Sequence, residues 1–175
     1  MAASDRNPSV DEPAPAGPRW LPASVLRERV EQEISRSERH GTELSCMLLA
    51  VENLDELAGD YDGVLREQAL EYLAATLQRE LRRFDAVGRP GERELLIVLP
   101  GADAQRAEIV ARRTLERLRT IKVEVDDTRT AMRVSIGLAG WRDGLAAGDL
   151  IETARTAARA GVEQGSGEAP ESHSR

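Results

Sequence analysis

The apolar residues of this chain follow two spacings, one typical of strands and one typical of helices. The run ELSCMLLAV, which ends at Val51, is continuous and of strand length, as expected for a strand buried on both faces. From Val64 to Arg83 and from Ala104 to Arg119, apolar residues recur at helical spacing. Between these segments, DAVGR and LLIVL flank the turn RPGERE and predict a hairpin of two strands.

Further elements are predicted on both sides of this centre. Ser24 is expected to cap a helix that runs to about His40 and stops at Gly41. The apolar stripe predicted for this helix consists of Val25, Leu26, Val30 and Ile34. ENLDELAGDYDG is expected to be a loop or a broken helix. IKVEV and RVSIGLA are predicted strands, and Asp149 to Ala160 is a predicted helix.

This order of elements predicts the fold class. A four- or five-stranded, mostly antiparallel sheet with helices on its outer side is the natural packing, which is an α/β (α+β) architecture close to the ferredoxin-like plan. The predicted domain covers residues 20–162. Residues 1–19 and 163–175 carry little apolar mass and are rich in Pro, Ala, Ser, Gly and charged residues, so we expect a disordered leader and a disordered tail.

Composition excludes several classes of function. With 41% hydrophobic residues the chain can build a real core. A formal net charge of −7 argues against binding to nucleic acid or to anionic membranes, which require clustered cations. No apolar stretch is long enough to span a bilayer or to form a signal peptide, and the single cysteine, Cys46, has no partner for a disulfide. We therefore expect a cytoplasmic protein.

Motifs around the hairpin carry a resemblance to a known family. RRFDAVGRPGERELLIVLP resembles the family pattern R-x-x-D-x-x-x-R-Y-G-G-D-E-F followed by a buried strand and Pro. Upstream, SERHG and the segment from Met47 to Leu70 hold the family spacing without gaps, and VSIGLA downstream resembles V-S-I-G-x-A. Over about 140 residues the chain is therefore similar to the GGDEF domains of diguanylate cyclases. The resemblance implies their fold and a link to cyclic di-GMP signalling.

The same resemblance implies that the catalytic residues have been lost. Active members hold two Mg²⁺ ions between acidic side chains and GTP, but Ala50 stands at the acid of the first strand and Arg93 at the metal-binding acid of the hairpin. Other family positions are also substituted: the second Gly of the hairpin tip by Glu92, the phosphate-facing Lys by Asp55, the guanine-reading Asn and Asp by Ala58 and Glu67, and the Lys of the last helix by Val162. Glu52 and Glu94 remain, and we interpret them as surface carboxylates. The sequence thus predicts no catalytic residue and no metal site.

A ligand site of the family matches better. Arg82 and Asp85 have the spacing of the R-x-x-D product site, and the gap-free register adds Arg113 from the following helix. The two arginines suit phosphate oxygens and guanine edges, while Asp85 accepts from guanine N–H groups. Arg and Asp are also common at a helix end for structural reasons, so this pattern alone leaves both interpretations open.

Three functions follow from these observations. The leading hypothesis is a non-catalytic regulatory module that binds a protein partner or forms a homodimer. The alternative is a cyclic di-GMP receptor that uses Arg82, Asp85 and Arg113. The least favoured is an active diguanylate cyclase with metal ligands built on Glu52 and Glu94. No cofactor is expected other than the cyclic di-GMP ligand of the alternative.

Overall fold

The structure is a computed structural model that describes residues 20–58, 64–120, 122–125 and 128–165. The predicted disordered leader, residues 1–19, lies outside the described residues, as do residues 166–175 of the predicted tail. Of the helices in the described part of the chain, none combines the length and the apolar character needed to cross a membrane.

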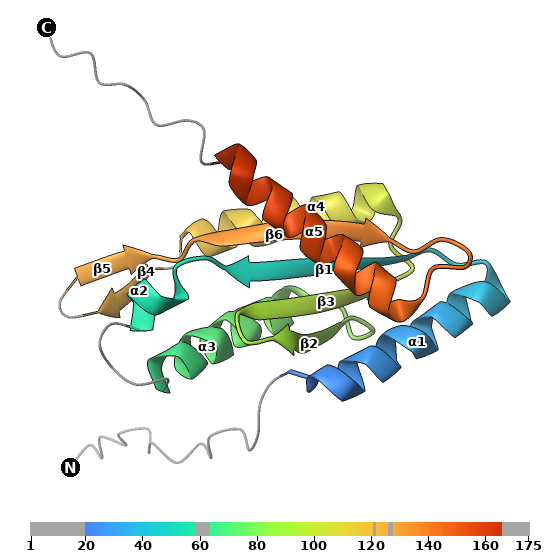
Figure 1. Cartoon of the computed structure of the whole chain (residues 1–175), viewed down its shortest axis with the longest axis horizontal. Coiled ribbons are helices and arrows are strands. Elements are labelled where there is room, and N and C mark those ends of the chain that lie inside the picture. Colours follow the sequence, from blue (N-terminus) through green and yellow to red (C-terminus); the bar gives the residue numbers. More distant parts are fainter. Residues whose placement is uncertain (1–19, 59–63, 121, 126–127, 166–175) are drawn as a thin grey trace, which may run out of the picture.

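A four-stranded antiparallel sheet forms the centre of the molecule (Figure 1). The strands lie in the order β2-β3-β1-β6, and their bounds are Leu44–Val51 for β1, Ala86–Gly91 for β2, Glu94–Pro100 for β3 and Val134–Gly140 for β6. A short and a long helix lie between β1 and β2 in the chain, and a helix followed by a small hairpin lies between β3 and β6, so the predicted ferredoxin-like plan is confirmed. A separate two-stranded sheet joins β4 (Lys122–Val125) to β5 (Thr128–Ala131).

Helices cover both faces of the sheet rather than one outer side. Their bounds are Ala23–His40 for α1, Leu54–Ala58 for α2, Val64–Glu80 for α3, Ala104–Arg119 for α4 and Ala147–Gly165 for α5. Side chains of α3 and α4 pack on one face, and those of α1 and α5 pack on the other. This is the expected consequence of strands that are apolar on both faces, because each face needs its own cover.

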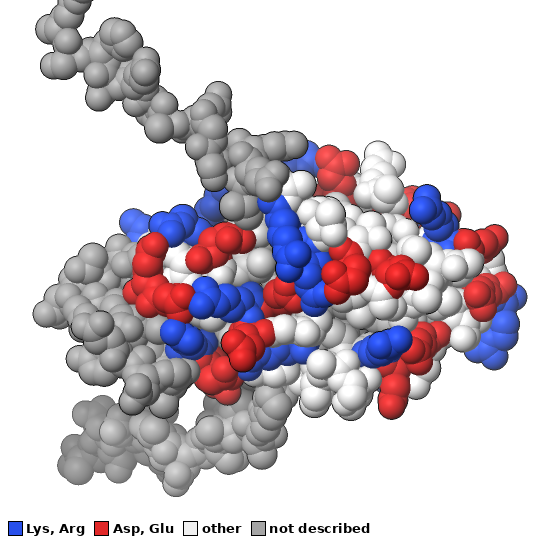
Figure 2. All heavy atoms as spheres, viewed as in Figure 1, with Lys and Arg blue, Asp and Glu red and all other residues white. Residues whose placement is uncertain are grey.

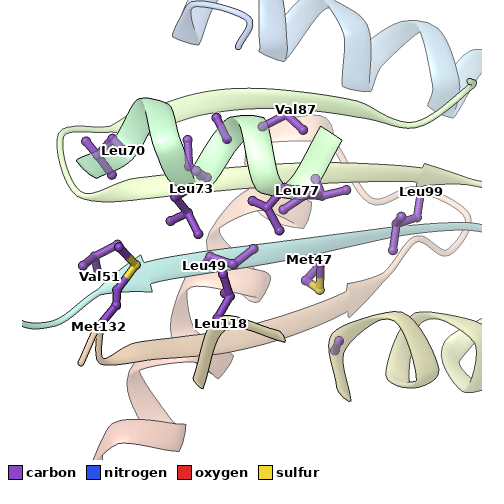
Figure 3. Close-up of a cluster of buried hydrophobic side chains, with 14 of the residues drawn as sticks. Met47, Leu49, Val51, Leu70, Leu73, Leu77, Val87, Leu99, Leu118 and Met132 are labelled. Carbon is purple, nitrogen blue, oxygen red and sulfur yellow. The ribbon is translucent and has the colours of Figure 1, made fainter. Parts of the chain in front are cut away.

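The first core lies between the sheet and the pair α3 and α4 (Figure 3). Alternate residues of β1, such as Met47 and Leu49, point into it together with Leu73 and Leu77 of α3 and Leu118 of α4. The intervening residues of β1 face the second core under α1 and α5. A strand with period-two side chains therefore supplies both cores from one apolar run.

The contact between β6 and α5 depends on a glycine. A Cβ atom on Gly137 would lie 2.0 Å from the carbonyl oxygen of Ala154 and 2.2 Å from the backbone nitrogen of Ala158. Only a residue without a side chain allows the helix backbone to approach the strand this closely. This glycine belongs to the VSIGLA segment.

Some sequence predictions were wrong in detail. Pro22, not Ser24, is the N-cap of α1, and no side chain caps this helix; the backbone oxygen of Pro22 accepts from the Leu26 N–H at 2.8 Å. Val25 is 43% exposed, whereas Glu33 is buried and lies 3.0 Å from Arg29. The buried stripe is thus rotated, and an ion pair makes the burial of a carboxylate tolerable. Helix α5 also continues to Gly165, past the predicted end at Ala160.

Candidate functional site

The first candidate region lies where the end of β1 meets the β2–β3 hairpin; we call it the hairpin-end site. Ala50 of β1 pairs with Glu94 of β3, and the N–H of Val51 donates to the carbonyl of Arg93 at 3.0 Å. The antiparallel register therefore brings Ala50, Glu52, Arg93 and Glu94 to one end of the sheet. A pocket of about 210 Å³ opens there, and it is also lined by Ser135 of β6 and by Arg155 and Arg159 of α5.

Glu94 is bound on both carboxylate oxygens by one arginine. Arg155 Nε lies 2.8 Å from Glu94 Oε1, and Arg155 Nη2 lies 2.7 Å from Oε2. The two side chains are only 16% and 17% exposed. These hydrogen bonds to Glu94 are the main cause that raises the pKa of Arg155, which also pairs with Glu152 on the same helix. A bidentate, largely buried pair holds α5 against the hairpin.

Glu52 also has a hydrogen-bond partner. The hydroxyl of Ser135 donates to Glu52 Oε1 at 2.6 Å, which links the residue after β1 to β6. The N–H of Glu52 donates to the carbonyl of Arg133 at 2.8 Å. Both remaining acids of the two family motifs are therefore engaged by other side chains.

Figure 2 shows acidic and basic side chains next to one another on this face of the molecule, and the acids around α2 and α3 are paired with arginines in the same way. Asp55 lies 2.6 Å from both Arg93 and Arg66, and its hydrogen bond with Arg93 is the main cause that lowers its pKa. Arg89 Nη1 and Nη2 bind Glu67 at 2.6 and 2.9 Å, and this hydrogen bonding lowers the pKa of Glu67. Carboxylates held by cations in this manner are stabilised in their charged form without a metal ion.

These observations bear on the metal and nucleotide positions that the resemblance implies. Among the described residues, no group of three or more His, Cys, Asp or Glu side chains is arranged to hold a metal ion. Two of the substituted positions, Ala58 and Val162, have side chains outside the described part of the structure. Arg66, Arg89, Ser135 and Arg155 were not selected as site residues from the sequence. Each of them contacts an acid in another segment of the chain, and the local sequence pattern does not indicate such pairs.

The second candidate region is the R-x-x-D segment, and the structure brings its three predicted residues together. Arg82, Asp85 and Arg113 line one pocket of about 150 Å³ between the start of β2 and helix α4. Asp85 Oδ2 accepts from the N–H of Arg82 at 2.8 Å, and burial raises the pKa of this carboxyl. Arg113 Nη2 lies 3.5 Å from Glu80 and its side chain is 66% exposed.

The same pocket contains a cation that sequence reasoning missed. Arg106 lies on α4 seven residues before Arg113, which places both on one face of the helix, and it also lines the pocket. Its side chain makes a long contact of 3.4 Å to the carbonyl of Gly101. Helical periodicity from Arg113 is the signal that could have identified it. Three arginines and one carboxylate thus surround this pocket.

Comparison with known proteins gives relatives of this chain in sequence. Diguanylate cyclase DgcP of Pseudomonas aeruginosa is 30% identical over 96 residues, which is 55% of this chain and 14% of that protein. Probable diguanylate cyclase DgcC of Escherichia coli K12 is 23% identical over 110 residues, or 63% of this chain and 29% of the relative. The chain therefore spans less than a third of the length of these relatives.

Solved structures of a diguanylate cyclase and of a GGDEF domain share the fold of this chain. Diguanylate cyclase SiaD from Pseudomonas aeruginosa, solved in complex with its activator SiaC, superposes with a TM-score of 0.76 at 27% identity, covering 82% of this chain and 55% of that one. The GGDEF domain of DgcB from Caulobacter crescentus, in complex with c-di-GMP, gives a TM-score of 0.76 at 17% identity, with 83% and 85% covered. The family described as "Diguanylate cyclase, GGDEF domain" matches residues 23–168, and the chain belongs to this GGDEF family.

Proposed function

We propose that this GGDEF domain is catalytically inactive and serves as a regulatory signalling module that acts through contact with another protein, in the cytoplasm. The observation that carries the proposal is the state of the hairpin-end site. Ala50 and Arg93 stand where the resemblance implies metal-binding acids. The acids that remain, Glu52 and Glu94, are held by Ser135 and Arg155.

The physical argument concerns what Mg²⁺ would need at this site. Mg²⁺ requires oxygen ligands in near-ideal octahedral geometry. To use Glu94 it would displace a bidentate arginine from a largely buried pair, and it would then lie beside the cations of Arg93 and Arg155. Removing Glu94 from its pair with Arg155 costs free energy, because the largely buried arginine then lacks the carboxylate that compensates its charge. Two-metal activation of a nucleotide is therefore disfavoured by the side chains themselves.

A direct assay tests the loss of activity. The purified protein is incubated with GTP and Mg²⁺ or Mn²⁺, cyclic di-GMP is measured by chromatography, and an active diguanylate cyclase is run in parallel. We expect no product above the blank without enzyme. If cyclic di-GMP forms only when the metal is added, and no longer forms in Glu52→Gln, the protein is instead a cyclase with unusual metal ligands.

Support for a protein partner comes from a relative. SiaD was solved in complex with an activator protein, so a GGDEF-containing chain with 27% identity to this one does contact a regulator. Affinity capture with the purified domain, followed by reconstitution from two purified proteins, tests the proposal here. A stable complex that forms without added nucleotide is the expected result. Analytical ultracentrifugation of the domain alone separates a homodimer from a complex with another protein.

A second candidate function is a receptor for cyclic di-GMP, favoured by the pocket that Arg82, Asp85 and Arg113 share. Arg113 is well exposed, and its 3.5 Å contact with Glu80 is long, so its guanidinium can turn to a phosphate oxygen at little cost. A relative of the same fold, DgcB, was solved in complex with c-di-GMP.

Calorimetric titration with cyclic di-GMP distinguishes the two candidates. A receptor should show saturable heat that is lost in Arg82→Ala and in Arg113→Ala. Arg83→Ala is the matched control, because Arg83 is the exposed neighbour of Arg82 and does not line the pocket. GTP with Mg²⁺ is titrated in parallel. Absence of heat at millimolar cyclic di-GMP would remove the receptor function and leave the protein-contact proposal standing.

A further inference from the structure

A third pocket lies at the free edge of the sheet, and it shares Glu52 and Ser135 with the hairpin-end site. The sheet ends at β6, which pairs with β1 on one side only. In Figure 1 this strand forms the upper edge of the sheet, with α4 behind it and the C-terminal half of α5 in front. A groove of about 780 Å³ lies at the first half of this edge, lined by Val134, Ser135 and Ile136 of β6, by the preceding Met132 and Arg133, and by residues of α4, α5 and the end of β1.

The register of β6 shows which backbone groups face the groove. The N–H of Glu52 donates to the carbonyl of Arg133, and the N–H of Trp141 donates to the carbonyl of Leu44, both at 2.8 Å. Because hydrogen-bonded pairs alternate in an antiparallel ladder, Ser135, Gly137 and Ala139 direct their backbone groups toward β1.

The intervening residues, Val134, Ile136 and Leu138, therefore direct their N–H and C=O groups outward. No hydrogen bond between residues that the structure describes reaches these outward groups. A row of unpaired donors and acceptors at strand spacing is a template for another extended backbone.

The groove is apolar on the side of α4 and at the start of β6, while the rest of its lining is polar. Leu115 and Leu118 of α4 lie on one side, and Met132, Val134 and Ile136 continue the lining along the strand. On the side of α5 the lining residue is Gly161, whose missing Cβ would lie 3.9 Å from the carbonyl oxygen of Ile136. The backbone of α5 therefore passes close to this outward carbonyl, and the missing side chain leaves space beside it.

Charge at the rim indicates the polar character of an occupant. Arg119, at the end of α4, is exposed and forms no ion pair with any described residue. Arg133 lies 2.7 Å from Glu56, but both side chains are more than half exposed, so this pair is weak. Glu52, the acid of the groove, accepts from Ser135. Within the described part of the chain, the rim thus offers a cation without an ion-pair partner, which complements a carboxylate.

We infer that the groove along β6 binds an extended, acidic peptide segment of a partner protein, which adds to the sheet as a fifth strand beside β6. Backbone hydrogen bonds with Val134, Ile136 and Leu138 supply the pairing, apolar side chains pack against α4, and a carboxylate lies at Arg119. Helices stand on both sides of the edge, which suits one extended chain rather than a second sheet. The inference rests on the proposed function only in taking a protein as the partner.

The probe is a fluorescein-labelled peptide of seven alternating valine and glutamate residues with blocked ends. Fluorescence anisotropy measures its binding to the full chain, and amide hydrogen exchange by NMR locates it. We expect saturable binding that slows exchange at Ile136 and Leu138. Arg119→Glu is expected to weaken binding at least about tenfold, since it reverses the rim charge. Arg112→Glu, an exposed position on α4 outside the groove, is the matched control and should not.

Three results would overturn the inference. The first is no saturable rise in anisotropy at millimolar protein, or binding that leaves exchange at Ile136 and Leu138 unchanged. The second is protection of these amides without peptide that increases with protein concentration, which assigns the edge to a second copy. The third is slow exchange of these amides without peptide that becomes fast when residues 166–175 are removed. In that case a segment of the same chain occupies the edge. Arg119 lines neither nucleotide pocket, so the GTP and cyclic di-GMP assays fail or succeed independently of this one.

Discussion

Arg155 of α5 and Glu94 of β3 form a bidentate ion pair across 61 residues of sequence, with contacts of 2.7 and 2.8 Å and side chains less than one fifth exposed. Glu94 is one of the two acids that remain from the motifs of the family, and the arginine that holds it comes from the last helix. The pair therefore serves the packing of α5 on the hairpin while it occupies a carboxylate at the hairpin-end site.

Removing one partner of this pair should destabilise the domain measurably. In Arg155→Ala, Glu94, which is only 17% exposed in the pair, loses its counter-charge, so we expect the free energy of unfolding to fall by about 3 kcal/mol. Arg159→Ala is the control, since Arg159 is exposed on the same face of α5, and its effect should stay below about 0.5 kcal/mol. Urea denaturation with an unchanged m-value is the measurement. Equal effects of the two substitutions would show that the pair is not structural.

The packing of α5 on β6 makes a second prediction about stability. Gly137→Ala places a methyl group within 2.2 Å of backbone atoms of Ala154 and Ala158, which cannot move independently of the helix. We expect a loss of about 3 kcal/mol, seen as a lowered midpoint of thermal unfolding. Gly140→Ala, on the same strand, meets nothing within 4 Å and should change the stability by less than about 1 kcal/mol. A small effect at Gly137 would mean that α5 does not pack this closely.

The sequence predicted elements whose pattern is local. The apolar run up to Val51, the hairpin and the bounds of α4 were recognisable because each depends on periodicity within one segment. Strand β5 was missed because TRTA is short and has no apolar alternation. The predicted ligand residues Arg82, Asp85 and Arg113 do lie together, because the spacing of the family fixes their positions on the fold.

The contacts that define the hairpin-end site were not predictable in this way. Arg155 lies in an alanine-rich helix, and nothing within the helix indicates that its side chain reaches β3. Likewise, the sequence allows an i,i+4 pair between Arg29 and Glu33 on α1, but it does not show that docking of the helix buries Glu33. Pairings between distant segments depend on helix docking, and local patterns carry no information about docking angles. The sequence can therefore place a long charged side chain on a helix, but it does not identify the partner of that side chain on another element.

The ion pair between Glu67 and Arg89 predicts a specific pH dependence. Hydrogen bonding to Arg89 lowers the pKa of Glu67 in the folded state, so its stabilising contribution is fully present above the ordinary glutamate pKa of about 4.3. It is lost as the pH falls through the lower folded pKa. Glu67 is half exposed, so the contribution at neutral pH is less than about 1 kcal/mol.

The measurement compares the wild type with Glu67→Gln by urea denaturation between pH 7 and pH 3. The wild type should be more stable at neutral pH, and the difference should vanish toward pH 3. Burial raises the pKa of Asp85, which changes the pH dependence of the stability in the opposite direction. This contribution is present in both proteins, so the difference in stability between them is compared rather than either curve alone. In an Arg89→Ala background the difference should be absent at every pH. A difference that persists there would assign the effect to something other than this pair.

The buried thiol of β1 gives a test of the central sheet itself. Cys46 is fully buried, and burial raises its pKa to about 12, so at pH 8 its thiolate fraction is roughly 10³-fold below that of an ordinary cysteine. Because the thiolate is the reactive species and no solvent reaches it, native protein should react with a disulfide reagent only by unfolding. Substitutions that destabilise the sheet, such as Gly137→Ala, should then accelerate labelling, while Gly140→Ala should not. Immediate stoichiometric labelling of the native wild type would contradict the placement of Cys46 between β3 and β6, since a side chain in that position has no path to solvent while the sheet is intact.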